Sequence, residues 1–219
     1  MRQLGLAFSA PRGETPRSVR GGARIGAGRK PRSVAERSTP HRARAQPQAR
    51  HPLHVTLRTA VRSLRKQQII QTVLGALRDS QRQGFRIAHY SVQANHLHLI
   101  VEAESKTVLS SAMRGLAIRV SLRVNRLLFR RGRLWADRWH SHTLKTPREV
   151  PNALRYVLQN HRKHGSWSSR LDPLSSAQWF NGFAQPLPAT FQSIGPPCIA
   201  SPKTWLLSVG WRRHGLIEI

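Results

Sequence analysis

Two histidines in one short segment are the first side chains of this sequence that could do chemistry together. His96 and His98 are separated by one residue in the segment 96–103, whose alternation is typical of a β-strand. A strand places alternate side chains on one face, so the two imidazoles would lie side by side and could share one cation. The spacing alone is a weak signal, because a His-x-His pair in a strand is more often structural than metal-binding.

A tyrosine and an asparagine later in the chain are the second candidate group. Tyr156 and Asn160 are four residues apart in a predicted helix and therefore share a face. The apolar stripe of this helix has five members: Val150, Ala153, Leu154, Val157 and Leu158. Tyr156 falls to the side of the stripe, so we expect its phenol to face a cleft. The other tyrosine, Tyr90, lies in a predicted strand, where packing is the simpler explanation.

A second His-x-His pair, His140 and His142, raises a rival hypothesis. Together with the first pair it could form a four-histidine structural zinc site. The neighbouring residues Arg138 and Lys145 fit contact with phosphate better, and we favour that interpretation.

The charge balance limits the partners of this chain. Its 37 Lys and Arg against nine Asp and Glu give a formal net charge of +28. Such an excess indicates a polyanionic partner, and nucleic acid is favoured over a membrane because no apolar run approaches the roughly 20 residues of a spanning helix. An enzyme built on two or three converging carboxylates would find few candidates here.

The single cysteine, Cys198, excludes an internal disulfide framework and a multi-cysteine zinc module. It suits a reducing compartment, and the stretch Leu4–Ala10 is too short and too interrupted for a signal peptide. We therefore expect a cytoplasmic protein associated with the nucleoid.

A dense run of arginines predicts a DNA-binding surface. It comprises Arg114, Arg119, Arg123, Arg126, Arg130, Arg131, Arg133 and, further along, Arg138. A solvated helix face would also be rich in arginine. Because few carboxylates are available to pair with these side chains, contact with the DNA backbone is the better interpretation.

The predicted elements follow in the order strand, helix, strand, strand, helix, strand, helix. They cover residues 54–58, 67–83, 85–93, 96–103, 108–128, 139–144 and 147–164, with Gly84 as the C-cap of the first helix and Thr146 as the N-cap of the last. A β-α-β-β-α-β unit is the ferredoxin-like motif, an α+β fold with an antiparallel sheet and helices on one face. The last helix, which carries the tyrosine, is an addition to it. His54 and His89 are interpreted as sheet histidines with no assigned role.

Three regions are predicted along the chain. Residues 1–50 lack hydrophobic periodicity and read as a disordered basic tail. Residues 51–165 form the domain that carries the candidate groups. Residues 166–219 hold four of the six tryptophans among prolines and serines, and we expect this extension to wrap the core through its aromatic side chains.

Four motifs in this order resemble a known family. They are His54–Arg58 (His-Val-Thr-Leu-Arg), Asn95–His98 (Asn-His-Leu-His), Trp135-x-x-Arg138 and Tyr156-x-x-x-Asn160. The set resembles the REP-associated tyrosine transposases, which belong to the HUH class of single-tyrosine, IS200-like transposases. The resemblance covers about residues 51–165, and it is the ordered set that is specific.

The sequence departs from the family pattern at three places. Gln93–Ala94 precede the Asn-His pair where many members have Met-Pro. His161 follows Asn160 where many members have proline, and Trp139 stands where another aromatic, often tyrosine, is usual. These differences concern the subfamily and the loop geometry more than the candidate catalytic set.

The resemblance implies a cut-and-join reaction on single-stranded, hairpin-bearing DNA. By this likeness His96, His98 and Asn160 would hold Mg²⁺ or Mn²⁺, with Gln159 as a weaker ligand candidate, and Tyr156 would be the nucleophile. A phenol with a pKa near 10 is a poor nucleophile at neutral pH, so a divalent ion at the phosphate would have to assist it. Two imidazoles and an amide would equally allow zinc. The resemblance leaves a monomer or a homodimer open.

Two other function classes stay open at this point. A non-catalytic nucleic-acid-binding protein could use the same ferredoxin-like sheet, and a zinc hydrolase could use a metal-bound water without forming a covalent adduct. The joint presence of His96, His98, Tyr156 and Asn160 favours the enzyme, because a binding module has no use for that set.

Overall fold

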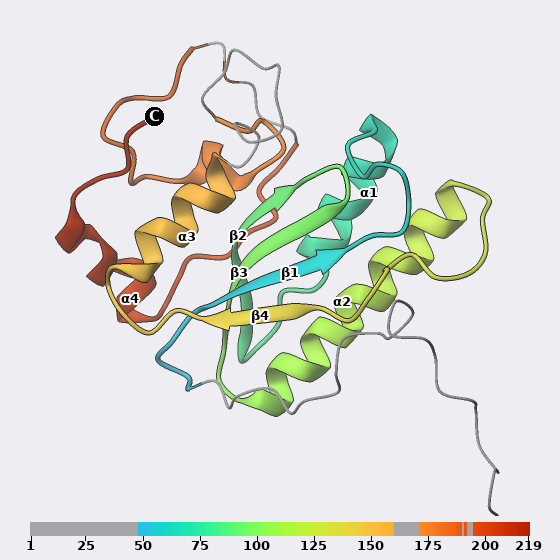
Figure 1. Ribbon diagram of the computed structural model, residues 1–219, viewed down its shortest axis with the longest axis horizontal. Helices are drawn as coiled ribbons and strands as arrows, with labels where there is room; N and C mark the ends of the chain where they lie inside the picture. The colour runs from blue at the N-terminus through green and yellow to red at the C-terminus, as the bar shows by residue number, and fades with distance from the viewer. Residues whose placement is uncertain (1–47, 160–170, 190, 192–194) are drawn as a thin grey trace, which may run out of the picture. The chain divides into compact units, whose positions relative to one another are not determined.

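The computed structural model describes residues 48–159, 171–189, 191 and 195–219 (Figure 1). These residues all belong to one compact unit, His41–Ile219. The main elements are β1 (Leu53–Arg58), α1 (Gln67–Arg78), β2 (Phe85–Val92), β3 (His96–Ala103), α2 (Lys106–Leu127), β4 (His140–Thr143) and α3 (Glu149–Leu158). The short helical segments near the C-terminus are η3 (Ser176–Trp179), α4 (Trp205–Ser208) and η4 (Gly210–His214).

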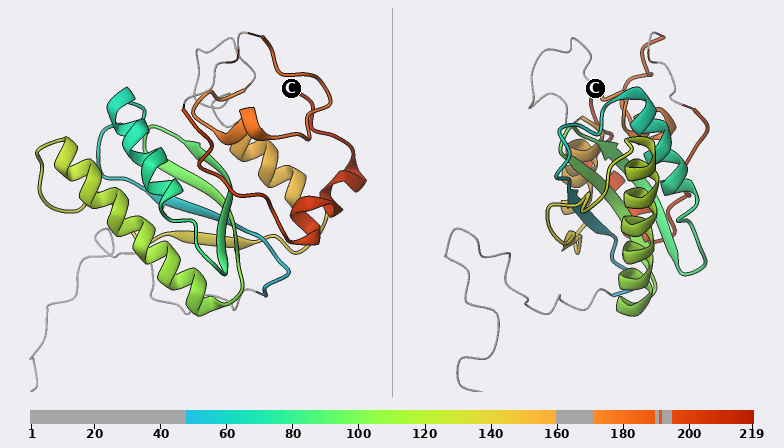
Figure 2. Two further views of the ribbon diagram at one scale, coloured as in Figure 1. Left: turned by 180° about the vertical axis from the view of Figure 1, so that it is seen from behind. Right: turned by 90° about the vertical axis from the view of Figure 1, so that its right-hand side faces the viewer.

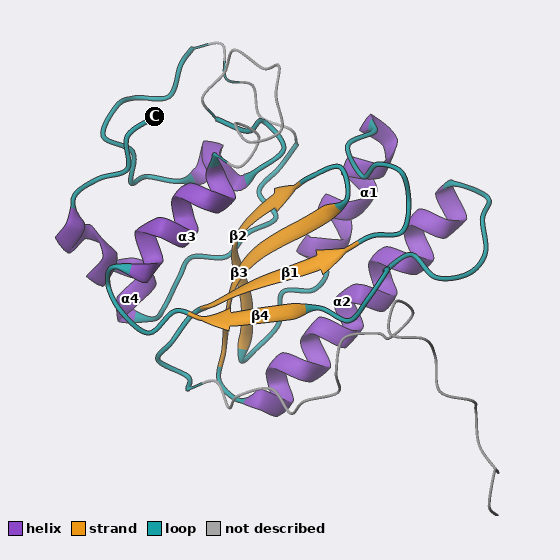
Figure 3. Cartoon of the chain, viewed as in Figure 1, coloured by secondary structure: helices purple, strands orange, loops and turns teal. Residues whose placement is uncertain are grey.

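The four strands form one antiparallel sheet in the order β2-β3-β1-β4 (Figure 3). The first strand lies between the third and the fourth, and the chain order is β-α-β-β-α-β, as in a ferredoxin-like unit. The predicted fold class is confirmed: an α+β, ferredoxin-like antiparallel sheet with an added helix that carries Tyr156.

Helices cover both faces of the sheet (Figure 2). The side chains of Leu53, Val55 and Leu57 in β1 are buried in one apolar cluster with those of α1 and α2. The added helix α3 packs on the opposite face, in a second cluster that includes Ala88 of β2 and Ile100 of β3. The residues that alternate with the apolar ones along β1 therefore face the side of α3.

The first helix ends earlier than predicted. It stops at Arg78 with Asp79 as its C-cap, because the residues that follow are polar and do not continue the apolar stripe. The side-chain amide of Gln81 instead donates to the carbonyl of Ile87 and accepts from its backbone N–H. Gly84, predicted as the C-cap, adopts a φ of +73° in the turn into β2.

The two hydrogen bonds of the predicted capping box are formed just before α3. The helix nevertheless begins at Glu149 with Arg148 as its N-cap, so the prediction of Thr146 as the N-cap is wrong. The Thr146 hydroxyl accepts from the backbone N–H of Glu149 at 3.3 Å, and the Glu149 carboxylate accepts from the backbone N–H of Thr146 at 3.1 Å. The predicted end near His164 is wrong, since the helix stops at Leu158. The carbonyl of Leu158 accepts from the backbone N–H of Asp172 at 3.3 Å.

The segment after α3 packs against this helix and the sheet. Phe180 and Trp211 are buried in the same cluster as the apolar stripe of α3. Trp205 is 49% exposed, and Trp167 lies outside the described residues. Nowhere in the described ranges does a helix combine the length and the apolar character needed to cross a membrane.

A buried histidine of β2 makes the stability of the fold depend on pH. Loss of hydration lowers the pKa of His89 from 6.5 to about 4. Between these values the unfolded chain binds a proton that the folded chain does not, so the free energy of unfolding falls as the pH drops through this window. We expect His89→Gln to remove on the order of 3 kcal/mol of this pH dependence, measured by urea unfolding at about pH 7 and about pH 4.5. Identical pH profiles for the variant and the wild type would contradict this assignment.

Candidate active site

Tyr156 lies over the histidine pair of β3. The ring centroids of Tyr156 and His98 are 5.2 Å apart, and the rings meet edge to face at 89°. The rings of His96 and His98 are stacked with centroids 5.8 Å apart. Tyr156 is 37% exposed, whereas His98 is 5% exposed. The structure thus brings together the two histidines and the tyrosine that the sequence singled out.

The strand register explains why these side chains meet. Thr56 of β1 is the antiparallel partner of His98, and His54 is the partner of Ile100 on one side and of His142 on the other. Partners in an antiparallel pair point to the same face. His54, Thr56 and His98 therefore share the face that α3 covers.

His54 is a third imidazole of this group, although sequence reasoning gave it no role. Its ring centroid lies 5.5 Å from that of His98 and 5.5 Å from that of Tyr156. Its Nε2 atom is buried without a hydrogen-bond partner. Burial, with a smaller contribution from the nearby His142, lowers its pKa from 6.5 to about 4. His54 is therefore neutral at physiological pH. Its alternation with Val55 in the central strand is the signal that could have identified it.

Both histidines of the pair use the same ring nitrogen for a side-chain contact. His96 Nδ1 lies 2.7 Å from Oδ1 of Asn95, and His98 Nδ1 lies 3.2 Å from Oγ1 of Thr56. An amide oxygen can only accept, so Nδ1 of His96 is the donor in this contact, and a neutral ring would offer Nε2 to a cation. Partners of this kind orient metal-binding imidazoles, and the donor set fits a divalent ion taken by the Nε2 atoms.

The four-histidine zinc hypothesis is wrong. β1 separates β3 from β4, so the two His-x-His pairs lie on strands that are not neighbours. His140 lies 4.0 Å from Asp137, and His142 lies 3.9 Å from Glu149. Across the part of the chain that the structure describes, no three or more His, Cys, Asp or Glu side chains are arranged to hold a metal ion.

The other predicted ligand, Asn160, lies outside the described residues. Gln159, the weaker candidate, donates its side-chain N–H to the backbone carbonyl of Glu218 at 2.6 Å.

The eight arginines of the predicted DNA-binding surface do not behave alike. Arg119 donates to the Ser80 hydroxyl at 2.7 Å, and Arg123 forms an ion pair with Asp79, so both tie α2 to the end of α1. This helix layer lies on the face of the sheet opposite to Tyr156. Arg130 donates to the carbonyl of Arg133 at 3.1 Å. The exposed members are Arg114, Arg126, Arg131, Arg133 and Arg138, and their contact with DNA stays a prediction.

The fold and this side-chain group define a class: a ferredoxin-like domain in which a helix-borne tyrosine lies over a strand-borne histidine pair. The family model "Transposase IS200 like" matches residues 49–160, just over half of the chain. The chain belongs to this family of transposases, and it is therefore an HUH-type transposase enzyme.

A solved structure has the same fold. It is the REP-associated tyrosine transposase bound to a REP hairpin, with a TM-score of 0.53 and 18% sequence identity. The similarity covers 64% of this chain and 84% of that one. No curated protein matches this chain.

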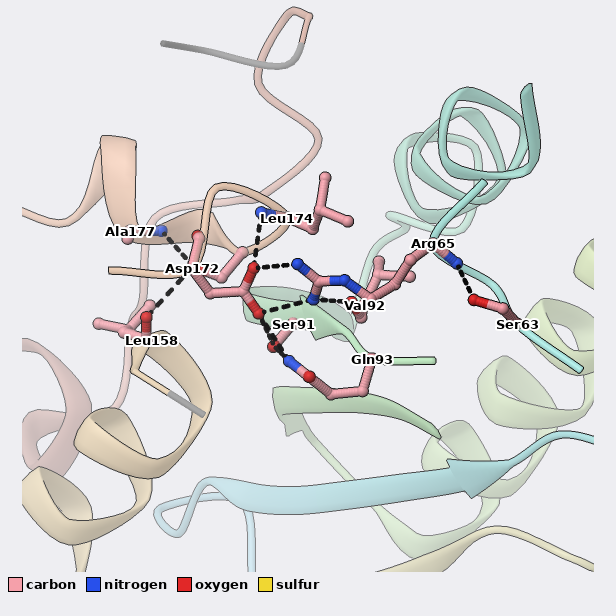
Figure 4. A network of polar contacts seen from close by, with 10 residues as sticks. Ser63, Arg65, Ser91, Val92, Gln93, Leu158, Asp172, Leu174 and Ala177 are labelled. Atoms are coloured by element: carbon pink, nitrogen blue, oxygen red, sulfur yellow. Dashed lines mark hydrogen bonds and ion pairs between the residues drawn. The ribbon is translucent and has the colours of Figure 1, made fainter. Parts of the chain in front are cut away.

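A buried carboxylate fixes the end of the tyrosine helix to the sheet (Figure 4). Asp172, which is 0% exposed, accepts two hydrogen bonds from the Arg65 guanidinium, at 3.0 and 3.1 Å. It also accepts from the side-chain amide of Gln93 at 2.6 Å and from the Ser91 hydroxyl at 3.3 Å. We call Asp172, Arg65, Gln93 and Ser91 the Asp172 clamp.

The clamp joins the elements that carry the candidate groups. Gln93 lies in the turn between β2 and β3, three residues before His96, and its backbone N–H donates to the carbonyl of His96 at 2.8 Å. The backbone N–H of Asp172 donates to the carbonyl of Leu158, two residues after Tyr156. Sequence reasoning missed the clamp. The one feature of the sequence that pointed to the clamp is Gln93, which stands where many members of the family have methionine.

Asp172→Asn should destabilise the protein strongly. The change leaves the partly buried Arg65 without its charged partner, and we expect a loss of roughly 3 kcal/mol in the free energy of unfolding, measured in urea. The matched control is Asp79→Asn, which breaks the half-exposed ion pair with Arg123 and should cost less than about 1 kcal/mol. Equal losses in the two variants would refute a special role for the clamp.

Proposed function

We propose that this transposase nicks and rejoins single-stranded, hairpin-bearing DNA, with Tyr156 as the nucleophile. The observation that supports the proposal is the edge-to-face contact of Tyr156 with His98, at 5.2 Å between ring centroids. A tyrosine that served only for packing would be expected in the apolar stripe of α3, whereas Tyr156 is 37% exposed beside that stripe.

The proposed reaction has two balanced steps. The Tyr156 oxygen bonds to the scissile phosphorus as the bond to the 3′ oxygen breaks, and the phenol proton replaces the phosphorus on that oxygen. The products are a 5′-phosphotyrosine and a free 3′-hydroxyl. A 3′-hydroxyl of another strand then attacks the same phosphorus, restores the phenol and rejoins the DNA. The phosphotyrosine keeps the bond energy, so rejoining needs no external energy source.

We propose that His96 and His98, together with Asn160, hold a divalent ion, Mg²⁺ or Mn²⁺ by family likeness. Bound there, such an ion would polarise the scissile phosphate and stabilise the charge that develops on it. Thr56 and Asn95 would orient the two imidazoles through these side-chain contacts at Nδ1, which leaves Nε2 of each ring for the ion. The neutral His54 would add no positive charge to the group.

The proposed substrate follows from charge and from the structural neighbour. A net charge of +28 favours a DNA partner, and the neighbour of the same fold is bound to a REP hairpin. On that basis we propose hairpin-bearing DNA as the substrate of this chain as well. The histidine pair and Tyr156 come from one chain, so a monomer would be sufficient for the reaction, and a homodimer remains an alternative. We place the reaction at the nucleoid in the cytoplasm.

Tyr156→Phe should abolish the covalent adduct and leave DNA binding nearly unchanged, because only the hydroxyl is lost. The measurement is incubation with hairpin-bearing single strands from the DNA that flanks the gene, with Mn²⁺ or Mg²⁺, followed by denaturing gel electrophoresis. The chain has only two tyrosines, so Tyr90→Phe is a matched control that should keep the adduct. An adduct in Tyr156→Phe would show that the nucleophile is misassigned, and cleavage without any adduct in the wild type would favour a metal-bound water instead.

His98→Gln should weaken binding of the divalent ion about tenfold or more and reduce cleavage in parallel. Binding of Mn²⁺ is measured by electron paramagnetic resonance in the absence of DNA, which separates the ion from the reaction. His142→Gln on the exposed β4 is the control, and it should bind Mn²⁺ as the wild type does. A normal Mn²⁺ affinity in His98→Gln would remove this histidine from the proposed ligand set.

A further inference from the structure

A cavity of about 460 Å³ lies beside β2, away from the tyrosine and histidine group. Its walls come from β2, from η3 and from the C-terminal segment that includes η4. None of His54, His98 and Tyr156 lines it. The volume falls in the range of about 300 to 1,000 Å³ that is usual for sites of small organic groups.

Three aromatic side chains, Trp179, Phe180 and Trp211, belong to the lining, where Phe180 and Trp211 are 8% and 1% exposed and Trp179 is half-buried. The ring centroids of Phe180 and Trp211 are 5.3 Å apart. This packing depends on Gly182, because a Cβ atom there would lie 2.2 Å from the Trp211 ring. Nucleobases stack on aromatic side chains without regard to sequence, and the half-buried Trp179 is the aromatic side chain of this lining that can receive one.

Polar and cationic groups lie at the same cavity. Arg212 donates to Oδ1 of Asn181 at 3.2 Å, and its guanidinium carbon lies 5.4 Å from the centroid of the Trp211 ring. The lining contains no carboxylate. Asn181 and the lining hydroxyl of Ser201 are side chains that can hydrogen-bond the edge of a base, and Arg212 can meet a phosphate.

The cationic surface continues beyond the cavity. The guanidinium carbon of Arg213 lies 4.9 Å from the ring centroid of Trp205, and both side chains are exposed. Lys203 is exposed two residues before Trp205. A free nucleotide would need one phosphate contact only, whereas several exposed cations together with a second aromatic ring fit a strand with successive phosphates.

We propose that this cavity takes one unpaired base of the DNA strand, while Arg212 and Arg213 neutralise the flanking phosphates. The occupant is a base in the single-stranded part of the substrate, next to the hairpin. The inference rests on the proposed function in that it assumes a DNA substrate. It assigns to residues 197–213 of the C-terminal segment a role in choosing which single-stranded flank is bound.

The test measures DNA binding by fluorescence anisotropy without divalent ion, so that no cleavage takes place. A hairpin with a single-stranded tail is compared with the hairpin alone, and each tail position is replaced in turn by an abasic site. In the wild type we expect one tail position at which the abasic site weakens binding about tenfold. A tail without any such position would overturn the proposal.

Two variants locate the effect. Ser201→Trp narrows the cavity without removing core atoms, and Arg212→Ala removes the cation. Both should bind the tailed hairpin about tenfold more weakly than the wild type, should bind the tailless hairpin normally, and should lose the sensitivity to the abasic site. Arg78→Ala, which removes one exposed charge at the end of α1, is the control for a general loss of charge. Thermal unfolding verifies that each variant is folded.

Several outcomes would overturn the proposal. If Ser201→Trp kept the sensitivity to the abasic site, the cavity would be excluded as the binding site of the base. If Arg78→Ala and Arg212→Ala weakened binding of the tailed hairpin equally, the contribution of Arg212 would be non-specific electrostatic attraction only. Saturation of the site by deoxynucleoside monophosphates, without any effect of the tail, would assign it to free nucleotides. The binding assay needs no cleavage. If binding depended on the tail but no Tyr156 adduct formed in the cleavage assay, the proposed reaction would be contradicted and the proposed base site would stand.

Discussion

The alternation of side chains in β1 is the constraint on which the candidate site depends. Burial of Leu53, Val55 and Leu57 against α1 and α2 directs His54 and Thr56 to the other face of the sheet. A shift of one residue in the pairing with β3 would expose the apolar set and bury the polar one, so the register is strongly specified. The packing energy of one face thereby fixes the positions of the imidazoles on the other.

The polar face is covered by α3. Its apolar stripe is buried in one cluster with Ala88, Ile100 and side chains of the C-terminal segment, and Tyr156 is left beside this contact. The Asp172 clamp adds a polar connection at the end of the helix. Burial of a carboxylate is costly, and here it is offset by hydrogen bonds from Arg65, Gln93 and Ser91. Replacement of both partners by apolar side chains would change the free energy of unfolding little, whereas the loss of one partner is costly. The geometry of the pair defines where the end of the helix lies.

Features set by local sequence could be predicted, and features set by distant contacts could not. The bounds of β3, the capping box at Thr146 and the apolar stripe of α3 follow from spacing within a few residues. The end of α3 could not be predicted, because the carbonyl of Leu158 is taken by the backbone of Asp172 across a sequence gap. His54 was underestimated for a similar reason: its proximity to Tyr156 is a property of the sheet and of α3 together.

The net charge of the chain does not by itself say which cations are available to DNA, nor how charge is arranged at the candidate site. Arg119 and Arg123 hold α1 to α2, so part of the positive charge serves the fold itself. At the candidate site the opposite problem arises, since the proposed divalent ion would be repelled by any additional cation. Burial keeps His54 neutral, with a pKa of about 4, beside His98. An exposed histidine at this position would be partly charged near neutral pH, because its pKa would return towards 6.5. The cover that α3 gives to this face thus presents the phenol and also keeps the neighbouring imidazole uncharged, so a single packing contact would serve both the proposed nucleophile and the electrostatics of the proposed ion.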